Sequence, residues 1–194
     1  MQERAAKLIA FLKEIEKFKT VERRNWTINP KRRESDADHS WHLCTLILLM
    51  EKELKEKVDI LHSLKLALTH DLVEIYAGDE MHFSKNKERA RTEEEKAARK
   101  LSEQLPEDLG KQIYDLWQEY EDNATREAKL INALDKLAPV LSDLPVDGKT
   151  HKEQHVTYDM VLKDKKPHIE SNKEHEILIE IYRQVLSEFE KIME

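Results

Sequence analysis

Apolar residues recur every three or four positions along most of the chain, and this spacing restricts the fold more than any other feature of the sequence. Over residues 2–18 it places Leu8, Leu12, Ile15 and Phe18 on one side, as an amphipathic helix requires. Glycine occurs only three times in 194 residues, whereas Ala, Leu, Lys and Glu recur throughout, a composition that favours helices over tight turns. We therefore predict an all-α protein.

The same periodicity predicts six further helices. They lie at about 36–54, 60–76, 88–104, 107–120, 125–142 and 174–192. Ser35 or Asp36 is suited to cap the first of these helices, and Gly78 follows the second, where a glycine commonly ends a helix. Residues 78–87 are predicted to form a loop, and the pattern in residues 143–173 favours no single structure.

The length of the chain indicates how the helices are organised. A chain of 194 residues is long enough for one domain with a sizeable core and short for two. We therefore expect one domain over residues 1–194. Its core would span about 24–142, with helix 2–18 and helix 174–192 packed on it.

Charge and composition exclude several classes of partner. The formal charge of −7 argues against a nucleic-acid duplex, whose binding depends on Lys and Arg. The longest apolar run, Leu46–Met50, is far shorter than the roughly 20 residues that cross a bilayer. Cys44 is the only cysteine, so no internal disulfide can form, and we expect a cytoplasmic protein without a membrane partner. Residues 19–33 carry six Lys or Arg against the single Glu22, which indicates either a site for a phosphorylated ligand or a solvated basic loop.

Two histidines and several carboxylates are the candidate functional residues of the sequence. His70 and Asp71 are adjacent near a predicted helix end, where both can reach one cation, and Glu74 follows on the same side of the helix. Such a pair can equally serve a helix-end hydrogen bond. His39 and Asp135 lie on the apolar stripes of their helices, where a buried imidazole or carboxylate needs a partner, either a cation or other polar groups.

Taken together, these residues resemble the pattern of the HD-domain phosphohydrolases, in which a His, a His-Asp pair and a distant Asp stand on separate helices. The resemblance covers about residues 26–141 and is closest to the 5'-deoxynucleotidase branch, the YfbR-like and HD-domain-containing proteins. It implies a single-domain HD-fold helical bundle. The supporting stretches are Glu34–His39, His70–Asp79, Leu105–Leu109, Asp115–Glu121 and Leu134–Leu137.

The resemblance implies a role for each matching residue. The implied metal ligands are His39, His70, Asp71 and Asp135. Glu74 would orient or deprotonate the attacking water, and Asp79 would help to hold water or the sugar. An Arg and a Trp would contact phosphate and deoxyribose, which indicates Trp26 with either Arg24 or Arg23. The family also implies a homodimer.

The implied reaction is hydrolysis of deoxynucleoside 5'-monophosphates with one divalent ion per chain. Two imidazoles and two carboxylates suit Mn²⁺, Co²⁺, Fe²⁺ or Zn²⁺, with Mg²⁺ as a further candidate. Three alternatives remain open at this point. The first is a phosphohydrolase for another nucleotide, such as a deoxynucleoside triphosphate or a guanosine alarmone. The second is a non-catalytic nucleotide-binding HD module. The third is a purely structural helical protein, which would bind no metal.

Overall fold

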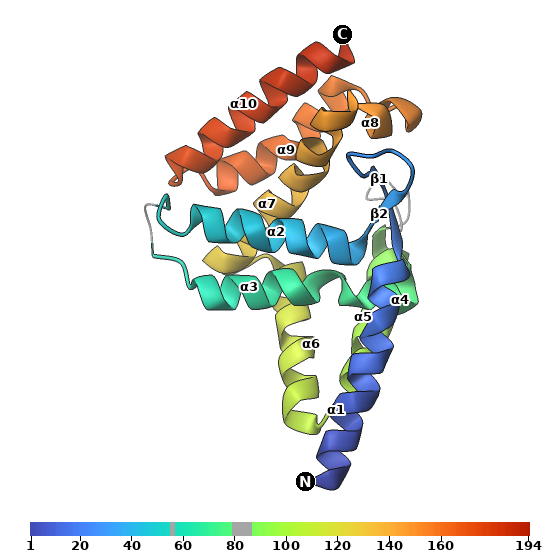
Figure 1. Ribbon diagram of the computed structural model, residues 1–194. Helices are drawn as coiled ribbons and strands as arrows, with labels where there is room; N and C mark the ends of the chain where they lie inside the picture. Colours follow the sequence, from blue (N-terminus) through green and yellow to red (C-terminus); the bar gives the residue numbers. More distant parts are fainter. Residues whose placement is uncertain (55–56, 79–86) are drawn as a thin grey trace.

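The computed structural model describes residues 1–54, 57–78 and 87–194, without the side chains of residues 87–90. The described chain is mostly helical, as predicted (Figure 1). Its α-helices are α1 (Gln2–Glu14), α2 (Asp36–Met50), α3 (Ile60–Thr69), α4 (Glu74–Ala77), α5 (Lys87–Ser102), α6 (Glu107–Asp122), α7 (Arg126–Asp143), α8 (Lys149–Glu153), α9 (Tyr158–Ser171) and α10 (Glu176–Met193). Short 3₁₀ helices are η1 (Ile15–Thr20), η2 (His70–Val73) and η3 (Leu144–Val146).

Helix α7 is the centre of the fold. It packs against α2 and α3 on one side and against α9 and α10 on the other (Figure 1). Leu130, Ile131 and Leu137 of α7 are fully buried, together with Leu43 of α2 and Leu66 of α3. Polar groups that α7 and α2 direct into this core are therefore enclosed by tightly packed side chains, which hold them in place.

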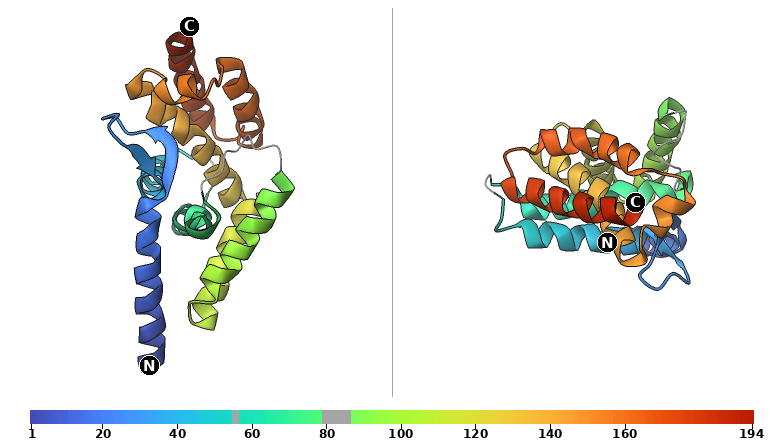
Figure 2. Two further views of the ribbon diagram at one scale, coloured as in Figure 1. Left: turned by 90° about the vertical axis from the view of Figure 1, so that its right-hand side faces the viewer. Right: turned by 90° about the horizontal axis from the view of Figure 1, so that it is seen from above.

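A second, smaller core joins the helices that extend away from this body. Phe11, Phe18, Leu101 and Trp117 are buried in it, so that α1, η1, α5 and α6 pack together. Figure 2 shows α1 as a long arm and α2 and α3 nearly end-on beside one another. Helix 2–18 of the sequence prediction corresponds to α1 continued by η1, with a change from α to 3₁₀ geometry at Ile15.

The start of α2 follows from its sequence. The Ser35 hydroxyl accepts a hydrogen bond from the Asp38 N–H, and the Asp38 carboxylate accepts one from the Ser35 N–H. This reciprocal capping box satisfies donors that the first turn would otherwise leave unpaired. It fixes the helix phase, so that His39, one turn later, faces the core.

Two segments differ from the sequence prediction. Residues 60–76 do not form one helix, because the chain changes to 3₁₀ geometry at His70 before α4 begins at Glu74. Part of the basic segment 19–33 is not loop: β1 (Glu22–Trp26) pairs with β2 (Arg33–Ser35) in an antiparallel hairpin whose register is irregular. Two such short strands carry no clear alternating pattern, which explains why periodicity did not reveal them.

Candidate metal centre and active-site cavity

His39 and Asp135 meet in the core although they are far apart in the sequence. His39 comes from α2 and is 1% exposed, and Asp135 comes from α7 and is 5% exposed. The distance between His39 Nε2 and Asp135 Oδ1 is 2.8 Å. The two apolar stripes that carry these residues pack against each other, and this packing brings the two polar groups together.

His70 reaches the same point from η2. Its Nδ1–H donates to the Ala67 carbonyl oxygen at 2.9 Å, which places the proton on Nδ1 and directs Nε2 inward. Within the described chain, this buried Nε2 has no hydrogen-bond partner. The His70 Nε2 atom lies 3.7 Å from Asp135 Oδ1. The candidate ligand atoms of His39, His70 and Asp135 all lie within 4.8 Å of one another.

Asp71 completes the group on the side that faces the cavity. Its Oδ2 lies 3.2 Å from His70 Nε2 and 3.8 Å from His39 Nε2. The structure thus brings together all four residues that the sequence predicted as ligands. Arg23 of β1 holds this carboxylate, because its Nη1 lies 2.9 Å from Asp71 Oδ2 and 3.2 Å from Asp36 Oδ1.

These residues fit a divalent ion. Two ligand atoms bound to one ion at about 2.1 Å lie about 3.0–3.4 Å apart, and the observed separations of 2.8–3.8 Å bracket that range. The buried Nε2 of His70, which faces the carboxylates of Asp71 and Asp135, is the lone-pair atom that such an ion would take. Its Nδ1 contact with a backbone carbonyl is the typical outer support of a metal-binding histidine.

The electrostatics of the site also favour a cation. Burial, together with Arg23, lowers the pKa of His39 to about 4, so its imidazole is neutral. Burial also lowers the pKa of His70, but Asp71 and Asp135 outweigh this effect and raise it to about 10. The two carboxylates therefore need positive charge beside them. Without an ion a proton on His70 supplies it, and a divalent ion would displace that proton.

The second carboxylate oxygen of Asp135 is also held by hydrogen bonds. The Tyr120 hydroxyl donates to Asp135 Oδ2 at 2.9 Å, and Lys136 Nζ donates to it at 2.8 Å. Both residues stand in stretches that carried the family resemblance, but the sequence reasoning gave neither a role. Nothing local marks Tyr120 as a partner of Asp135, because the contact depends on how α6 packs against α7.

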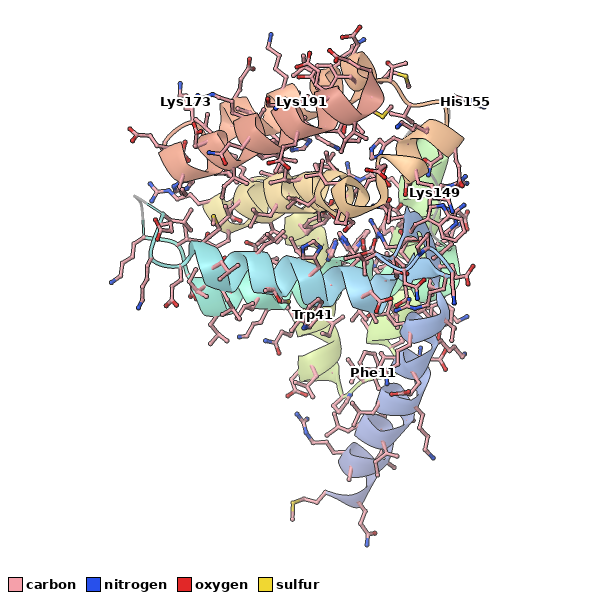
Figure 3. All side chains as sticks on the ribbon, turned by 45° about the horizontal axis from the view of Figure 1, so that its top comes forward. Phe11, Trp41, Lys149, His155, Lys173 and Lys191 are labelled. Atoms are coloured by element: carbon pink, nitrogen blue, oxygen red, sulfur yellow. The ribbon has the colours of Figure 1, made fainter. Side chains whose placement is uncertain are left out.

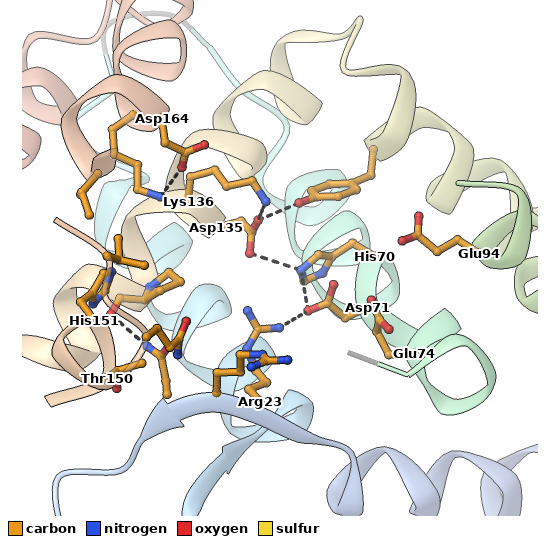
Figure 4. Close-up of a pocket in the computed structure, with 18 of the residues that line it drawn as sticks. Arg23, His70, Asp71, Glu74, Glu94, Asp135, Lys136, Thr150, His151 and Asp164 are labelled. Carbon is orange, nitrogen blue, oxygen red and sulfur yellow. Dashed lines mark hydrogen bonds and ion pairs between the residues drawn. The ribbon is translucent and has the colours of Figure 1, made fainter. Parts of the chain in front are cut away.

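A cavity of about 270 Å³ opens from the metal-ligand candidates. This volume is near the lower end of the range that small-molecule sites occupy. Glu74 lines it as the first residue of α4, and Arg23 and Arg24 line it from β1. Figure 4 draws Glu74 and Glu94 on one side of Asp71 and His70, and Thr150 and His151 on the other.

Three predicted site residues do not line this cavity or cannot be placed. His39 is not among the lining residues, although its Nε2 lies 2.8 Å from Asp135, which is. Trp26 is not among the residues that line the cavity: its ring lies between Arg33 and Lys149, whose charged groups are 3.8 and 3.9 Å from the ring centre. The Trp26 Nε1–H donates to Glu153. Asp79 lies outside the described residues.

The cavity also contains residues that the sequence reasoning missed. Glu121 of α6 and Glu94 of α5 both line the cavity, and burial together with Glu94 raises the pKa of Glu121 to about 7. At the other end stand His151 of α8 and the buried Lys165 of α9. They come from helices with no motif in common, so no local signal could have grouped them. No helix in the described part of the chain is long and apolar enough to cross a membrane.

Comparisons with known proteins identify the family of the chain. The HD domain family model matches residues 15–177. The human 5'-deoxynucleotidase HDDC2 is 32% identical over 150 residues, covering 76% of this chain and 72% of the human protein. The Dictyostelium discoideum 5'-deoxynucleotidase HDDC2 is 32% identical over 151 residues, covering 74% of this chain and 80% of that protein.

A solved structure extends the similarity over nearly the whole chain. The crystal structure of a predicted metal-dependent phosphohydrolase from Magnetospirillum magnetotacticum MS-1 has a TM-score of 0.86 and is 35% identical, covering 97% of this chain and 96% of that one. The expected HD fold is thereby confirmed. The chain belongs to the HD domain family and is a phosphohydrolase of that family, similar to the 5'-deoxynucleotidases.

Proposed function

We propose that the protein hydrolyses deoxynucleoside 5'-monophosphates to a deoxynucleoside and phosphate. The observation that carries this proposal is the buried cluster of His39, His70 and Asp135 beside a cavity of about 270 Å³, in a chain whose relatives are named 5'-deoxynucleotidases. We further propose that His39, His70, Asp71 and Asp135 hold one divalent ion. Mn²⁺, Co²⁺, Fe²⁺ and Zn²⁺ suit this donor set best, and Mg²⁺ is a further candidate.

Glu74, Arg24 and Arg23 have separate roles in the proposed reaction. A bound divalent ion supplies Lewis-acid chemistry, because it polarises the phosphoryl group and lowers the pKa of water. Glu74, beside Asp71 at the start of α4, orients the attacking water and takes its proton. Arg24 is exposed and lines the cavity, so its guanidinium is placed to bind the phosphate oxygens. Arg23 instead positions Asp71, because two carboxylates already engage it.

The family resemblance also implies contacts for Asp79 and Trp26. Asp79 would hold water or sugar, as the family resemblance implies. Trp26 would contact the sugar only if its ring left its present position beside Arg33 and Lys149. We therefore propose that its observed contacts hold the hairpin against α8. The phosphate contact is assigned to Arg24 because its guanidinium has no hydrogen-bond partner in the described chain.

The decisive experiment is release of phosphate from dAMP, AMP, dATP and a guanosine alarmone, with each of the five divalent ions. We expect hydrolysis of dAMP, with much slower release from AMP and dATP. Equal rates on AMP and dAMP would contradict the sugar preference, and faster cleavage of dATP or the alarmone would favour the alternative nucleotides. Tight binding of dAMP without cleavage under all ions would favour the non-catalytic module.

We also propose that two copies of the chain associate through an apolar surface on α2 and α3. Both helices pack on α7, and their opposite sides carry exposed apolar residues; Trp41 lies on the side of α2 away from α7 (Figure 3). These residues are Trp41, Leu48, Leu49, Leu61 and Leu68, each 54–71% exposed. Together they expose on the order of 600 Å² of surface, close to the ~800 Å² that each partner of a stable complex buries.

The association is tested by light scattering after size-exclusion chromatography. The wild-type protein should have the mass of a dimer, and Trp41→Glu with Leu61→Glu should have that of a monomer. Met160→Glu, at an exposed apolar residue of α9, is the control and should stay dimeric. A monomeric wild-type protein, or a dimeric double variant, would contradict the proposed interface.

A further inference from the structure

The cavity has two chemically different ends beyond the metal-ligand candidates. Toward α4, α5 and α6 it is lined by Glu74, Glu94 and Glu121. Toward α8 and α9 its lining includes the apolar side chains of Val156 and Val161. The first end disfavours a phosphate by charge repulsion, and the second offers apolar contact together with hydrogen-bonding groups, as sites for heterocyclic ligands do.

His151 is fixed at the second end by a residue that nothing else in the site uses. Its Nδ1 lies 2.8 Å from Oδ2 of Asp143, which is fully buried. The Asp143 carboxylate also accepts the backbone N–H groups of Thr150 and His151. Three hydrogen bonds therefore set the position of this imidazole, and its ring makes an edge-to-face contact with the ring of Phe189. With Nδ1 held by Asp143, Nε2 is the atom left to meet a ligand.

The direction of the proposed reaction relates this end to the substrate. In phosphoryl transfer, the attacking and leaving oxygens lie on opposite sides of the phosphorus. Glu74, which positions the water, and His151 stand on opposite sides of the metal-ligand candidates (Figure 4). If water attacks from the side of Glu74, the 5'-oxygen and the nucleoside attached to it must leave toward α8 and α9.

We propose that the α8–α9 end of the cavity binds the nucleobase, and that His151 recognises it through Nε2. The inference rests on the proposed 5'-nucleotidase activity and names the part of the site that recognises the nucleoside. Val156 and Val161 contact the faces of the base, whose aromatic ring is apolar there. The Gln154 side chain, which also lines this end, presents an amide to its polar edge. The ligand class is a purine or pyrimidine joined to a phosphorylated sugar.

The test separates the two nitrogens of His151. In His151→Asn the amide NH₂ replaces Nδ1, so that the bond to Asp143 is kept and Nε2 is lost. In His151→Gln the longer amide replaces Nε2 instead. The matched control is His42→Ala, a half-buried histidine outside the cavity. The two substrates are dAMP and 2-deoxyribose 5-phosphate, which has the same phosphomonoester and sugar but no base.

We expect His151→Asn to lower kcat/KM for dAMP about tenfold through KM, with kcat and all constants for 2-deoxyribose 5-phosphate unchanged. His151→Gln should restore part of the loss, and His42→Ala should behave as wild type. An equal fall on both substrates, or no fall on dAMP, would overturn the proposal. So would a wild-type enzyme that cleaves both substrates equally well.

Calorimetry distinguishes failure of this inference from failure of the proposed reaction. If the wild-type protein cleaves neither substrate, the proposed reaction fails, but dAMP should still bind about tenfold more tightly than 2-deoxyribose 5-phosphate. The same advantage should disappear in His151→Asn. Equal affinity of the two compounds for the wild-type protein would overturn the assignment of this end to the base.

Discussion

The metal-ligand cluster and the α8–α9 end of the cavity are built in different ways. The cluster takes its side chains from α2, η2 and α7, and His39, His70 and Asp135 are each at most 5% exposed within the main core. The α8–α9 end takes its side chains from the five-residue helix α8, the segment that connects it to α9, and the start of α9. The candidate metal ligands, whose positions must stay fixed, are thus embedded in packed helices. The residues proposed to select the ligand stand on a short helix and the chain next to it.

Substitution of a candidate metal ligand should have the largest effect on activity. Asp135→Asn keeps the size of the side chain but removes the charge that His39 and His70 face. We expect loss of bound metal and a fall in kcat of about 10³-fold. Elemental analysis and phosphate release measure the two effects. Asp122→Asn, at an exposed aspartate on α6, is the control; normal metal content in Asp135→Asn would rule out its role as a ligand.

A smaller loss of activity is expected from substitution of Glu74, the residue proposed to orient and deprotonate the attacking water. Glu74→Gln keeps the hydrogen-bonding shape but cannot accept a proton, so kcat should fall about 10²- to 10³-fold. Because Glu74 is not a proposed ligand, the metal content measured by elemental analysis should stay at the wild-type value. Unchanged phosphate release from a metal-loaded Glu74→Gln protein would remove Glu74 from the mechanism.

Substitutions of the two adjacent arginines of β1 should affect different properties, stability for Arg23 and substrate binding for Arg24. Arg23 pairs with Asp36, which is fully buried, so Arg23→Ala should lower the free energy of unfolding by about 3 kcal/mol. Arg24 is exposed, so Arg24→Ala should change stability by less than about 0.5 kcal/mol. It should instead raise KM for dAMP about tenfold. Urea unfolding and steady-state kinetics measure the two quantities, and the reverse pattern would exchange the two roles.

The smallest effect concerns the acidic end of the cavity and depends on pH. Glu121 has a pKa of about 7, above its ordinary value of 4.5, because of burial and Glu94. The folded protein therefore binds this proton more tightly than the unfolded chain does. Its stabilisation is complete below pH 4.5 and is lost as the pH rises through 7. Glu121→Gln should thus raise the free energy of unfolding at pH 8 by about 1 to 2 kcal/mol, allowing for partial exposure.

Denaturant unfolding at pH 4.5 and pH 8 measures this difference. At pH 4.5 the variant and the wild-type protein should differ in stability by only about 0.4 kcal/mol, because the carboxyl group is protonated in the folded wild-type chain and about half protonated in the unfolded one. Glu119→Gln, at the neighbouring acid that pairs with His62, is the control. A stabilisation by Glu121→Gln that is the same at both pH values would contradict the raised pKa.

The sequence by itself determined most of the helices, though not those within residues 143–173, and the inward direction of the key side chains. The period of α2 and α7 placed His39 and Asp135 on apolar stripes, and a buried polar group on such a stripe needs a partner. The His70–Asp71 pair was visible because its residues are adjacent. These signals are local, since a helix repeats every 3.6 residues and its own sequence therefore states which side is buried.

Only the tertiary structure decided which side chains that are far apart in the sequence contact one another. Arg23 reaches Asp71 over 48 residues because the hairpin folds back onto η2. Tyr120 reaches Asp135 because α6 packs beside α7. Residues 143–173 gave no clear pattern, and yet they supply His151 and its support by Asp143. Periodicity indicates that a side chain is buried, but the packing of separate helices determines which residue it contacts. No local sequence pattern encodes that packing.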